Sequence, residues 1–401
     1  MIGVDLGTTN VRIHVKGRGV VLREPAVIAV VKGTTDVKAV GEDAYRMLGR
    51  TPGNITAVRP MADGVIADYT LTEKMLKAFI SKVLTGANRL LRPNIMVCIP
   101  SGITEVEKRA VLQAINEIGA RRAFLIEEPV AGAIGAGINI ADPVGSMVID
   151  IGGGTTDIAI ISMGGIVVSE SLRIAGNTFD RDLMAFVKAQ HNLLIGDRTA
   201  EEIKRTVGAA VVTGQEDDRS MEVRGRDLID GMPKSVTITT EDVVRSLNGS
   251  LDKIAAGVRK VLEQAPPELV SDVIERGIVM TGGGAKLRNL DAYLRRVTNV
   301  PVAMAETPED CVVLGTAKAL DMSHVLQLPR GHRSLTPAPS STRRRGGWRT
   351  PRKRRGRRRR RCRDAPASRR HARPVPGPSG RSPRSLRGRR RVGAPPAPWP
   401  C

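Results

Sequence analysis

The chain has 401 residues and a formal net charge of +22, from 63 Lys or Arg against 41 Asp or Glu. The excess lies in residues 330–401, which contain 25 of the basic residues and one acid, Asp364, so that residues 1–329 hold 38 basic and 40 acidic residues. This distribution excludes a basic, nucleic-acid-binding body, no apolar stretch reaches the roughly 20 residues of a transmembrane helix, and the near-neutral part is long enough for two α/β domains with separate cores.

The first predicted elements are two strands around a Gly/Thr turn. Ile2–Asp5 is an apolar strand that ends in an acid, Gly7–Asn10 is the turn, and a second apolar strand follows. Because Met1 leads directly into the first strand, no signal peptide is expected. Residues of about 33–66 contain several turn signals, and we expect them to form an inserted small subdomain.

Helical and strand patterns then alternate. Apolar residues at helical spacing predict a helix over Leu71–Leu84, and a continuous apolar run predicts a buried strand over Asn94–Pro100. Thr104–Glu107 has the pattern of a capping box at the start of a helix. After a short strand at Phe124–Ile126, the segment Glu128–Gly137 is predicted to be a helix of small residues that can pack its backbone close to a neighbour.

The second half opens as the first does. Ser146 begins a strand that ends near Asp150, and the turn Gly152–Thr156 leads into another apolar strand. A second inserted small subdomain is expected over about 181–241. The remaining expected elements are helices over Asp180–Gln190, Glu201–Ala210, Val243–Leu262 and Leu287–Val297, strands within Met221–Thr240 and over Gly277–Thr281, and a closing segment over Glu309–Leu320.

The repeat predicts two related α/β domains, over residues 1–144 and 145–325, that face each other across a cleft. Cys98 and Cys311 lie far apart in apolar runs, as reduced core thiols do. Residues 326–401 have too few aliphatic residues to form a core and are expected to be disordered. Two origins of this basic tail stay open: an arm for nucleic acid or an anionic membrane, or a shifted reading frame through GC-rich DNA, which would produce its Arg, Pro, Gly, Ala and Ser. We assign no function to the tail.

The two Gly/Thr turns have the chemistry of a phosphate site. Glycine lets backbone N–H groups approach phosphate oxygens, and threonine and asparagine add side-chain donors. Asp5 and Asp150 end the preceding strands and face one gap, where two carboxylates suit a hydrated Mg2+. The alternative, two tight hairpins with glycine for turn geometry alone, does not account for the matching acids. The expected phosphate contacts are Gly7, Thr8, Thr9, Asn10, Gly152, Gly153, Gly154, Thr155 and Thr156.

Two further segments have functional chemistry. Glu127 and Glu128, ahead of Pro129, offer a carboxylate that can orient a nucleophilic water. The alternative for this pair is a charged helix N-terminus that the helix dipole favours. Gly282–Gly284 lies between a predicted strand and a predicted helix, where ligands often bind, and could seat a sugar or a base.

Five blocks together resemble the actin-like ATPase superfamily. They are Asp5–Asn10, Glu128–Pro129, Asp150–Asp157, Gly282–Gly284 and Leu314–Ala317. Within that superfamily the chain resembles the MreB/Mbl family of bacterial actins, the rod-shape-determining proteins, and the similarity covers about residues 1–322. The segments typical of that family are Arg50–Asn54, Asp63–Asp68, Ile195–Lys204, Arg224–Asp227 and Pro266–Leu269.

The resemblance implies two ribonuclease H-like domains around a nucleotide cleft, and an ATPase that couples slow ATP hydrolysis to polymerisation. It implies that Asp5 and Asp150 hold Mg2+ through water, and that Glu128, rather than Glu127, promotes hydrolysis. The implied adenosine contacts are Glu201, Glu202, Ile203, Lys204, Gly282, Gly283, Gly284 and Ala285. Proteins of this family form paired filaments in the cytoplasm, on the inner face of the plasma membrane, where they work with the cell-wall elongation machinery to organise peptidoglycan synthesis and rod shape.

Some positions depart from the family pattern. Thr9 stands where Ala is frequent, and Asn177 stands where Asp is common. Family members usually have a few more residues before the first strand, sometimes a membrane-binding helix, for which Met1 leaves no room. Membrane contact is therefore expected at Leu90 and Leu91, which lie between two arginines on a predicted loop. The alternative is that both leucines complete the core of the first domain.

Two other functions share parts of this pattern. A DnaK-type ATPase chaperone would have the same turns, but it also needs a β-rich peptide-binding domain, which residues 330–401 cannot form. A sugar kinase would need a catalytic Asp aimed at a hydroxyl group and large substrate-specific insertions, which we do not find. A cytoskeletal ATPase is therefore the preferred function.

Overall fold

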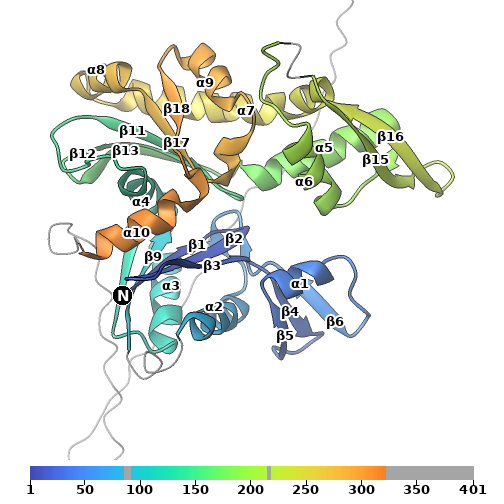
Figure 1. The fold of residues 1–401 in the computed structure, drawn as a ribbon, viewed down its shortest axis with the longest axis horizontal. Coiled ribbons are helices and arrows are strands. Elements are labelled where there is room, and N and C mark those ends of the chain that lie inside the picture. The colour runs from blue at the N-terminus through green and yellow to red at the C-terminus, as the bar shows by residue number, and fades with distance from the viewer. Residues whose placement is uncertain (85–91, 215–217, 322–401) are drawn as a thin grey trace, which may run out of the picture. The chain divides into compact units, whose positions relative to one another are not determined.

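The structure, a computed structural model, describes residues 1–84, 92–214 and 218–321. Each half of this part of the chain contains a five-stranded sheet (Figure 1). The strand order of the first sheet is β10 (Arg122–Glu127), β9 (Asn94–Ile99), β1 (Ile2–Leu6), β2 (Asn10–Val15), β3 (Gly19–Pro25). The order of the second is β13 (Gly165–Leu172), β12 (Thr156–Ser162), β11 (Ser146–Ile151), β17 (Ile278–Thr281), β18 (Val302–Met304).

The two sheets have the same topology. In the first, β1 pairs antiparallel with β2 and parallel with β9. In the second, β11 pairs antiparallel with β12 and parallel with β17. The predicted repeat of sequence is therefore confirmed as a repeat of topology, and the two Gly/Thr turns occupy equivalent places between the first two strands of each sheet.

Each half also has a small sheet of its own (Figure 1). The first consists of β4 (Ile28–Val31), β5 (Val37–Val40) and β6 (Ile55–Val58), with α1 (Glu42–Met47) beside it, and β7 (Met61–Ala62) pairs with β8 (Val65–Ile66) after it. The second consists of β14 (Leu193–Leu194), β15 (Ser220–Asp227) and β16 (Pro233–Thr239), with α5 (Gly176–His191) and α6 (Asp197–Thr206). The first small sheet begins before residue 33, where the insertion was expected, because β4 pairs with β5 and β6 and not with β3.

The helices of the first half follow local sequence signals. Helix α2 (Tyr69–Val83) buries the predicted apolar face, namely Leu71, Met75, Leu76, Phe79, Ile80 and Val83. Helix α3 (Glu105–Glu117) begins with the predicted capping box. The backbone N–H of Glu107 donates to Thr104 Oγ1 over 3.3 Å, and the Glu107 carboxylate accepts from the Thr104 N–H at 2.8 Å. These contacts satisfy donors that the first turn of a helix leaves free.

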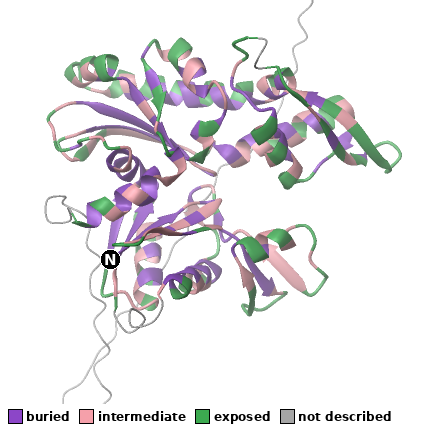
Figure 2. Cartoon of the chain, viewed as in Figure 1, coloured by how far each residue is buried: buried purple, intermediate pink, exposed green. Residues whose placement is uncertain are grey.

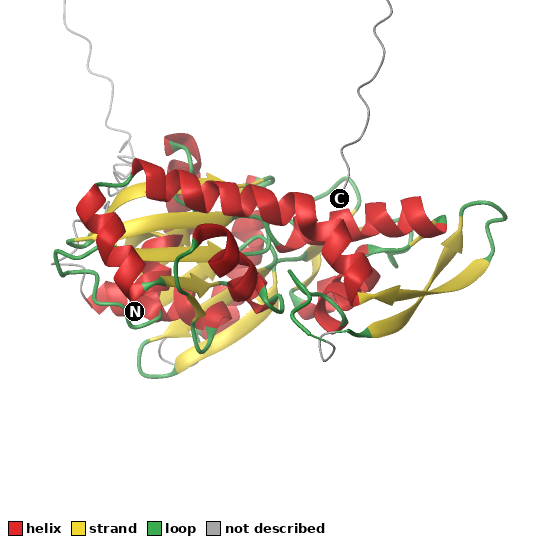
Figure 3. Ribbon diagram, turned by 90° about the horizontal axis from the view of Figure 1, so that it is seen from above, coloured by secondary structure: helices red, strands yellow, loops and turns green. Residues whose placement is uncertain are grey.

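In the second half the longest helix, α7 (Thr240–Gln264), packs on β12 and β13. Figure 3 shows a long helix lying along the strands in this way. Helix α7 starts before the predicted Val243 because Thr239 and Asp242 form a second capping box. Helices α8 (Pro267–Arg276) and α9 (Leu290–Thr298) and the 3-10 turns η3 (Gly283–Lys286) and η4 (Pro308–Asp310) complete this half. Buried residues concentrate in the strands and on the inner faces of the helices (Figure 2).

Two helices connect the sheets. Helix α4 (Glu128–Gly135) packs on β11, and α10 (Cys311–Asp321) packs on β1 and on α4 (Figure 1). A Cβ added at Gly135 would lie 1.8 Å from the carbonyl oxygen of Cys311, and one added at Gly315 would lie 1.7 Å from that of Ala131. The predicted close approach of the small-residue helix to a neighbour is confirmed, and it holds the start of α4 between the sheets.

None of the helices in the described ranges combines the length and the apolar character that crossing a bilayer requires. Cys98 and Cys311 are buried free thiols, as predicted.

Candidate functional site

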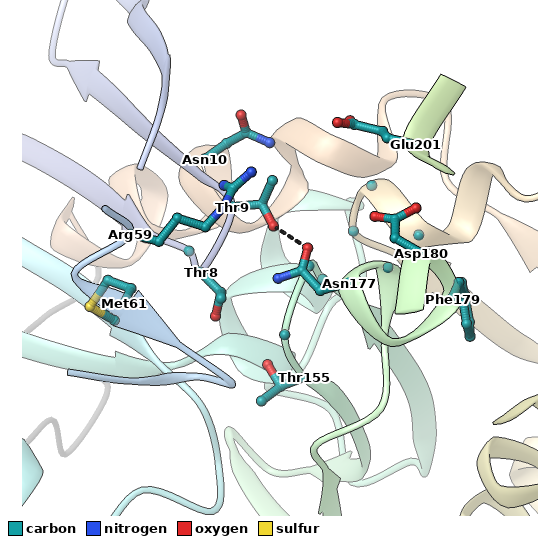
Figure 4. Close-up of a pocket in the computed structure, with 18 of the residues that line it drawn as sticks. Thr8, Thr9, Asn10, Arg59, Met61, Thr155, Asn177, Phe179, Asp180 and Glu201 are labelled. Atoms are coloured by element: carbon teal, nitrogen blue, oxygen red, sulfur yellow. Dashed lines mark hydrogen bonds between the residues drawn. The ribbon is translucent and has the colours of Figure 1, made fainter. Parts of the chain in front are cut away.

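A cavity of about 930 Å³ lies between the two halves and is lined by both Gly/Thr turns. The first turn joins β1 to β2 and the second joins β11 to β12, so the repeated topology directs both toward one space. Figure 4 shows Thr8 of the first turn facing Thr155 of the second, and Thr9 of the first turn facing Asn177. Residues Gly282–Gly284, which follow β17, also line the cavity.

The tips of the turns are in contact with each other. A Cβ added at Gly153 would lie 1.9 Å from Thr9 Oγ1, and one added at Gly154 would lie 2.5 Å from Thr8 Oγ1. Glycine at these two positions is therefore required by the approach of the opposite turn. The consequence is a cavity whose wall is continuous from one half of the molecule to the other.

Three carboxylates line the cavity and are almost completely buried: Asp5 is 7% exposed, Asp150 4% and Glu128 7%. Asp5 pairs with Arg12 at 3.3 Å, and Asp150 Oδ1 accepts a hydrogen bond of 2.7 Å from Thr281 Oγ1. Removal of these groups from water opposes their ionisation. The cavity therefore has an unusually high density of acids for its solvent exposure.

The pKa values of these groups follow from burial and mutual repulsion. Burial raises the pKa of Asp5, and the Arg12 guanidinium opposes that effect. Burial raises the pKa of Asp150 as well, and the charges of Asp157 and Asp5 add to the increase. Burial, followed by the charges of Asp157, Asp150 and Asp5, raises the pKa of Glu128 well above its usual range. A positive charge placed in the cavity would lower the pKa of all three carboxyl groups.

This set of donors fits a hydrated Mg2+. Asp5 and Asp150 come from equivalent strands of the two sheets, and Mg2+ typically contacts one or two carboxylates while keeping several waters. Within the described residues, no three His, Cys, Asp or Glu side chains converge closely enough to hold a metal by themselves. Asp5 and Asp150 are the residues that would hold the ion, through its waters.

The structure distinguishes the two adjacent glutamates. Glu128, the first residue of α4, lines the cavity, whereas Glu127 is the residue before the helix and is not among the lining residues. Asp157 lies on β12, and its Oδ1 accepts hydrogen bonds from the N–H and Oγ of Ser101 at 2.8 and 2.6 Å. These contacts join the first half to the second near the acids.

Most of the predicted nucleotide contacts line the cavity, but four do not. Ile203 and Ala285 belong to the hydrophobic core of the second half. Thr156 is fully buried and its Oγ1 donates to the carbonyl oxygen of Ile174 at 2.7 Å, while Glu202 is exposed. In a helix, residues three apart share a face and the two between them point elsewhere, so Glu201 and Lys204 of α6 line the cavity and Glu202 and Ile203 do not. The predicted membrane residues Leu90 and Leu91 lie outside the described residues.

The structure adds a polar cluster that the sequence did not indicate. Tyr45 donates a hydrogen bond of 3.1 Å to Glu201 Oε2 across the cavity. The Cζ atoms of Arg59 and Arg198 lie 5.8 and 5.4 Å from the centre of the Tyr45 ring. These residues come from segments far apart in the sequence, and no local pattern joins them. Arg12 also lines the cavity and was not predicted. The sequence could have indicated it, because strand alternation places Arg12 on the same face of β2 as the predicted residue Asn10.

The comparisons with known proteins agree on one family. The family model described as MreB/Mbl protein matches residues 1–327. The chain is 49% identical over 320 residues to the cell shape-determining protein Mbl of Bacillus subtilis (strain 168), covering 80% of this chain and 95% of that protein. It is 50% identical over 325 residues to the cell shape-determining protein MreB of Escherichia coli (strain K12), covering 80% and 93%.

Solved structures support the same fold. MreB5 of Spiroplasma citri bound to ADP is 40% identical with a TM-score of 0.76, and the match covers 81% of this chain and 96% of that one. The MamK double helical filament, at 22% identity and a TM-score of 0.68, shares the fold. The matches do not support the DnaK-type alternative. With the repeated sheets and the shared cavity, they establish that this chain has the actin-like fold and belongs to the MreB/Mbl family of cell shape-determining proteins.

Proposed function

We propose that this protein binds ATP and Mg2+ in the 930 Å³ cavity, hydrolyses the ATP slowly and assembles into filaments that organise cell-wall synthesis from the inner face of the plasma membrane. The observation that carries this proposal is the convergence of both Gly/Thr turns, Asp5 and Asp150 on one cavity. MreB5 of Spiroplasma citri is described as bound to ADP and to AMPPNP, which supports a nucleotide there. MamK is described as a double helical filament, which supports self-assembly.

The residues of the site take distinct roles in this proposal. Thr8, Thr9, Asn10 and Gly153–Thr155 bind the phosphates. Mg2+, placed by Asp5 and Asp150, would neutralise developing negative charge on the transferred phosphate. Glu201, Lys204 and Gly282–Gly284 hold the adenosine. Ile203, Ala285, Thr156 and Glu202, which do not line the cavity, are left out of the contact set.

Glu128 is the residue proposed to orient and deprotonate the attacking water. Its raised pKa means that it holds a proton strongly in an empty cavity. Because the increase depends partly on the charges of Asp150 and Asp5, positive charge near those two aspartates lowers the pKa of Glu128 and favours its ionised form, which is the form that can accept a proton. Binding at the aspartates and water activation at Glu128 are thereby coupled through electrostatics.

The test compares Glu128→Gln with Glu127→Gln, a matched change at the adjacent glutamate outside the cavity lining. Loss of a general base typically costs about 10²–10⁴-fold in rate, so Glu128→Gln should hydrolyse ATP that much more slowly while ATP binding and ATP-dependent sedimentation remain. Glu127→Gln should behave as the parent. Equal rates for Glu128→Gln and the parent would remove Glu128 from the mechanism, and a parent that does not sediment with ATP and Mg2+ would contradict filament assembly.

Membrane attachment through Leu90 and Leu91 remains part of the proposal. Two apolar residues flanked by arginines suit an anionic surface. Liposome pelleting of the double variant Leu90→Ser, Leu91→Ser should show weaker binding than the parent, and unchanged pelleting would exclude this segment.

A further inference from the structure

One hydrogen bond joins the two halves directly at the cavity wall. Thr9, in the turn between β1 and β2, donates from Oγ1 to Asn177 Oδ1 over 3.1 Å (Figure 4). Asn177 is in the first turn of α5, and its backbone N–H donates to the carbonyl oxygen of Gly153 at 2.8 Å. Asn177 is therefore held by both Gly/Thr turns, through its side chain and through its backbone.

This contact orients the Asn177 carboxamide. Because the carboxamide oxygen faces Thr9, the nitrogen lies on the opposite side of the planar group. Figure 4 shows that nitrogen directed toward the space between Thr8 and Thr155, which both line the cavity. Within the described part of the chain no hydrogen bond from Asn177 Nδ2 to protein is present. A donor thus points, without a protein acceptor, at the space enclosed by the two turns.

The start of α5, where Asn177 stands, suits an anion. The first turn of α5 contains no acidic residue, and the start of a helix has a partial positive charge. An Asp at position 177 could still accept the Thr9 hydrogen bond, but it would replace the free N–H donor with a negative oxygen. Asn and Asp have nearly the same shape, so the difference between them at this position is one of charge and donor capacity.

We propose that Asn177 is a further nucleotide-contacting residue, whose Nδ2 donates to an oxygen of the nucleotide phosphates. Thr9 is its positioning residue, because its hydroxyl group fixes the carboxamide from the opposite half of the molecule. The inference rests on the proposed function, since it requires ATP in this cavity. It also links the orientation of a phosphate donor to the contact between the two turns.

The experiment measures binding of ATP, ADP and adenosine, in the presence of Mg2+, by calorimetry on the full chain. The variants are Asn177→Asp, Thr9→Val and the double variant, and thermal unfolding is measured without nucleotide. Asn177→Asp should bind ATP and ADP roughly 10-fold or more weakly, as expected for one lost hydrogen bond and an added repulsion, with adenosine unchanged. Its unfolding temperature should be equal to or above that of the parent, because an acid at the start of a helix is favourable.

Thr9→Val keeps the shape of Thr9 and removes only the hydroxyl group, so it should weaken ATP and ADP binding less than Asn177→Asp does. The double variant should lose less affinity than the product of the two single losses, because both changes disturb the Asn177 contact and that shared part is lost only once. Unchanged ATP and ADP affinity in Asn177→Asp, or an equal loss for adenosine, would overturn the phosphate contact. Losses that multiply in the double variant would overturn the positioning role of Thr9. A parent that binds no nucleotide would overturn the proposed function itself. A parent that binds ATP together with variants of equal affinity would overturn only the role of Asn177.

Discussion

At the scale of single residues, the two turns leave space for a hydrogen atom and not for a methyl group. The Cα of Gly153 lies against the side chain of Thr9 from the other half, so that an added Cβ would be 1.9 Å from Thr9 Oγ1 and 2.7 Å from Thr9 Cβ. The backbone of Gly153 does not have a positive φ. Steric contact across the cleft, rather than a special backbone conformation, therefore requires glycine at this position.

We expect Gly153→Ala to force the two turns apart and to weaken ATP binding at least about 10-fold, because overpacking between rigid segments costs on the order of 1–3 kcal/mol. Thr9→Gly removes the two side-chain atoms that the new methyl group would clash with, but it also removes a proposed phosphate contact. The double variant should therefore regain part of the thermal stability that Gly153→Ala loses, and not its ATP affinity. Gly165→Ala is the control, since a Cβ there meets nothing within 4 Å. Calorimetric titration with ATP and thermal unfolding are measured for all four proteins. Parental affinity in Gly153→Ala would contradict contact between the turns in solution.

At the scale of elements, the packing of α4 against α10 supports the start of α4, where Glu128 stands. The two helices approach so closely that their backbones touch at Gly135 and Gly315. Helix α10 also packs on β1, and α4 packs on β11. The position of Glu128 therefore depends on a contact between helices that are distant in sequence.

Gly315→Ala should disturb this contact, because its Cβ would lie 1.7 Å from the carbonyl oxygen of Ala131. Backbone atoms cannot rotate away, so we expect a loss of stability of about 1–3 kcal/mol or more, together with slower ATP hydrolysis. Gly249→Ala is the matched control: Gly249 is exposed within α7 and a Cβ there meets nothing within 4 Å, so the change should stabilise the protein by about 0.5–1 kcal/mol. Denaturant unfolding measures both, and a Gly315→Ala midpoint equal to that of the parent would contradict the account.

Elements with local signals could be predicted from the sequence, and contacts between distant segments could not. The apolar spacing of α2 and the capping box at Thr104 are both visible in a few consecutive residues. The contact of Tyr45 with Glu201 joins positions that no short pattern relates. The family resemblance implied four consecutive contacts, Glu201–Lys204. Because α6 is a helix, only residues on one of its faces can line the cavity, and of these four they are Glu201 and Lys204.

At the scale of the whole molecule, several side-chain hydrogen bonds join the two halves. Besides Thr9 with Asn177, Tyr45 contacts Glu201, and Ser101 contacts Asp157. The formal charges of the compact part cancel: Met1–Leu335 forms one compact unit with 40 basic and 40 acidic residues. The net charge of +22 therefore belongs to residues 336–401, which hold 23 Lys or Arg and one acid.

This separation predicts two independent behaviours. The full chain should bind double-stranded DNA of any sequence at low salt, with the logarithm of the association constant falling by about 0.9 per phosphate neutralised for each tenfold rise in salt. A chain that ends at Leu335 should lose this binding, because its charges balance, and should keep the ATP affinity and ATP-dependent sedimentation of the parent. Titration with a labelled duplex at several salt concentrations measures the first property, and calorimetry and sedimentation measure the second. DNA binding that survives the truncation would place a basic surface on the compact part, and a loss of ATP affinity would show that residues 336–401 contribute to the cavity.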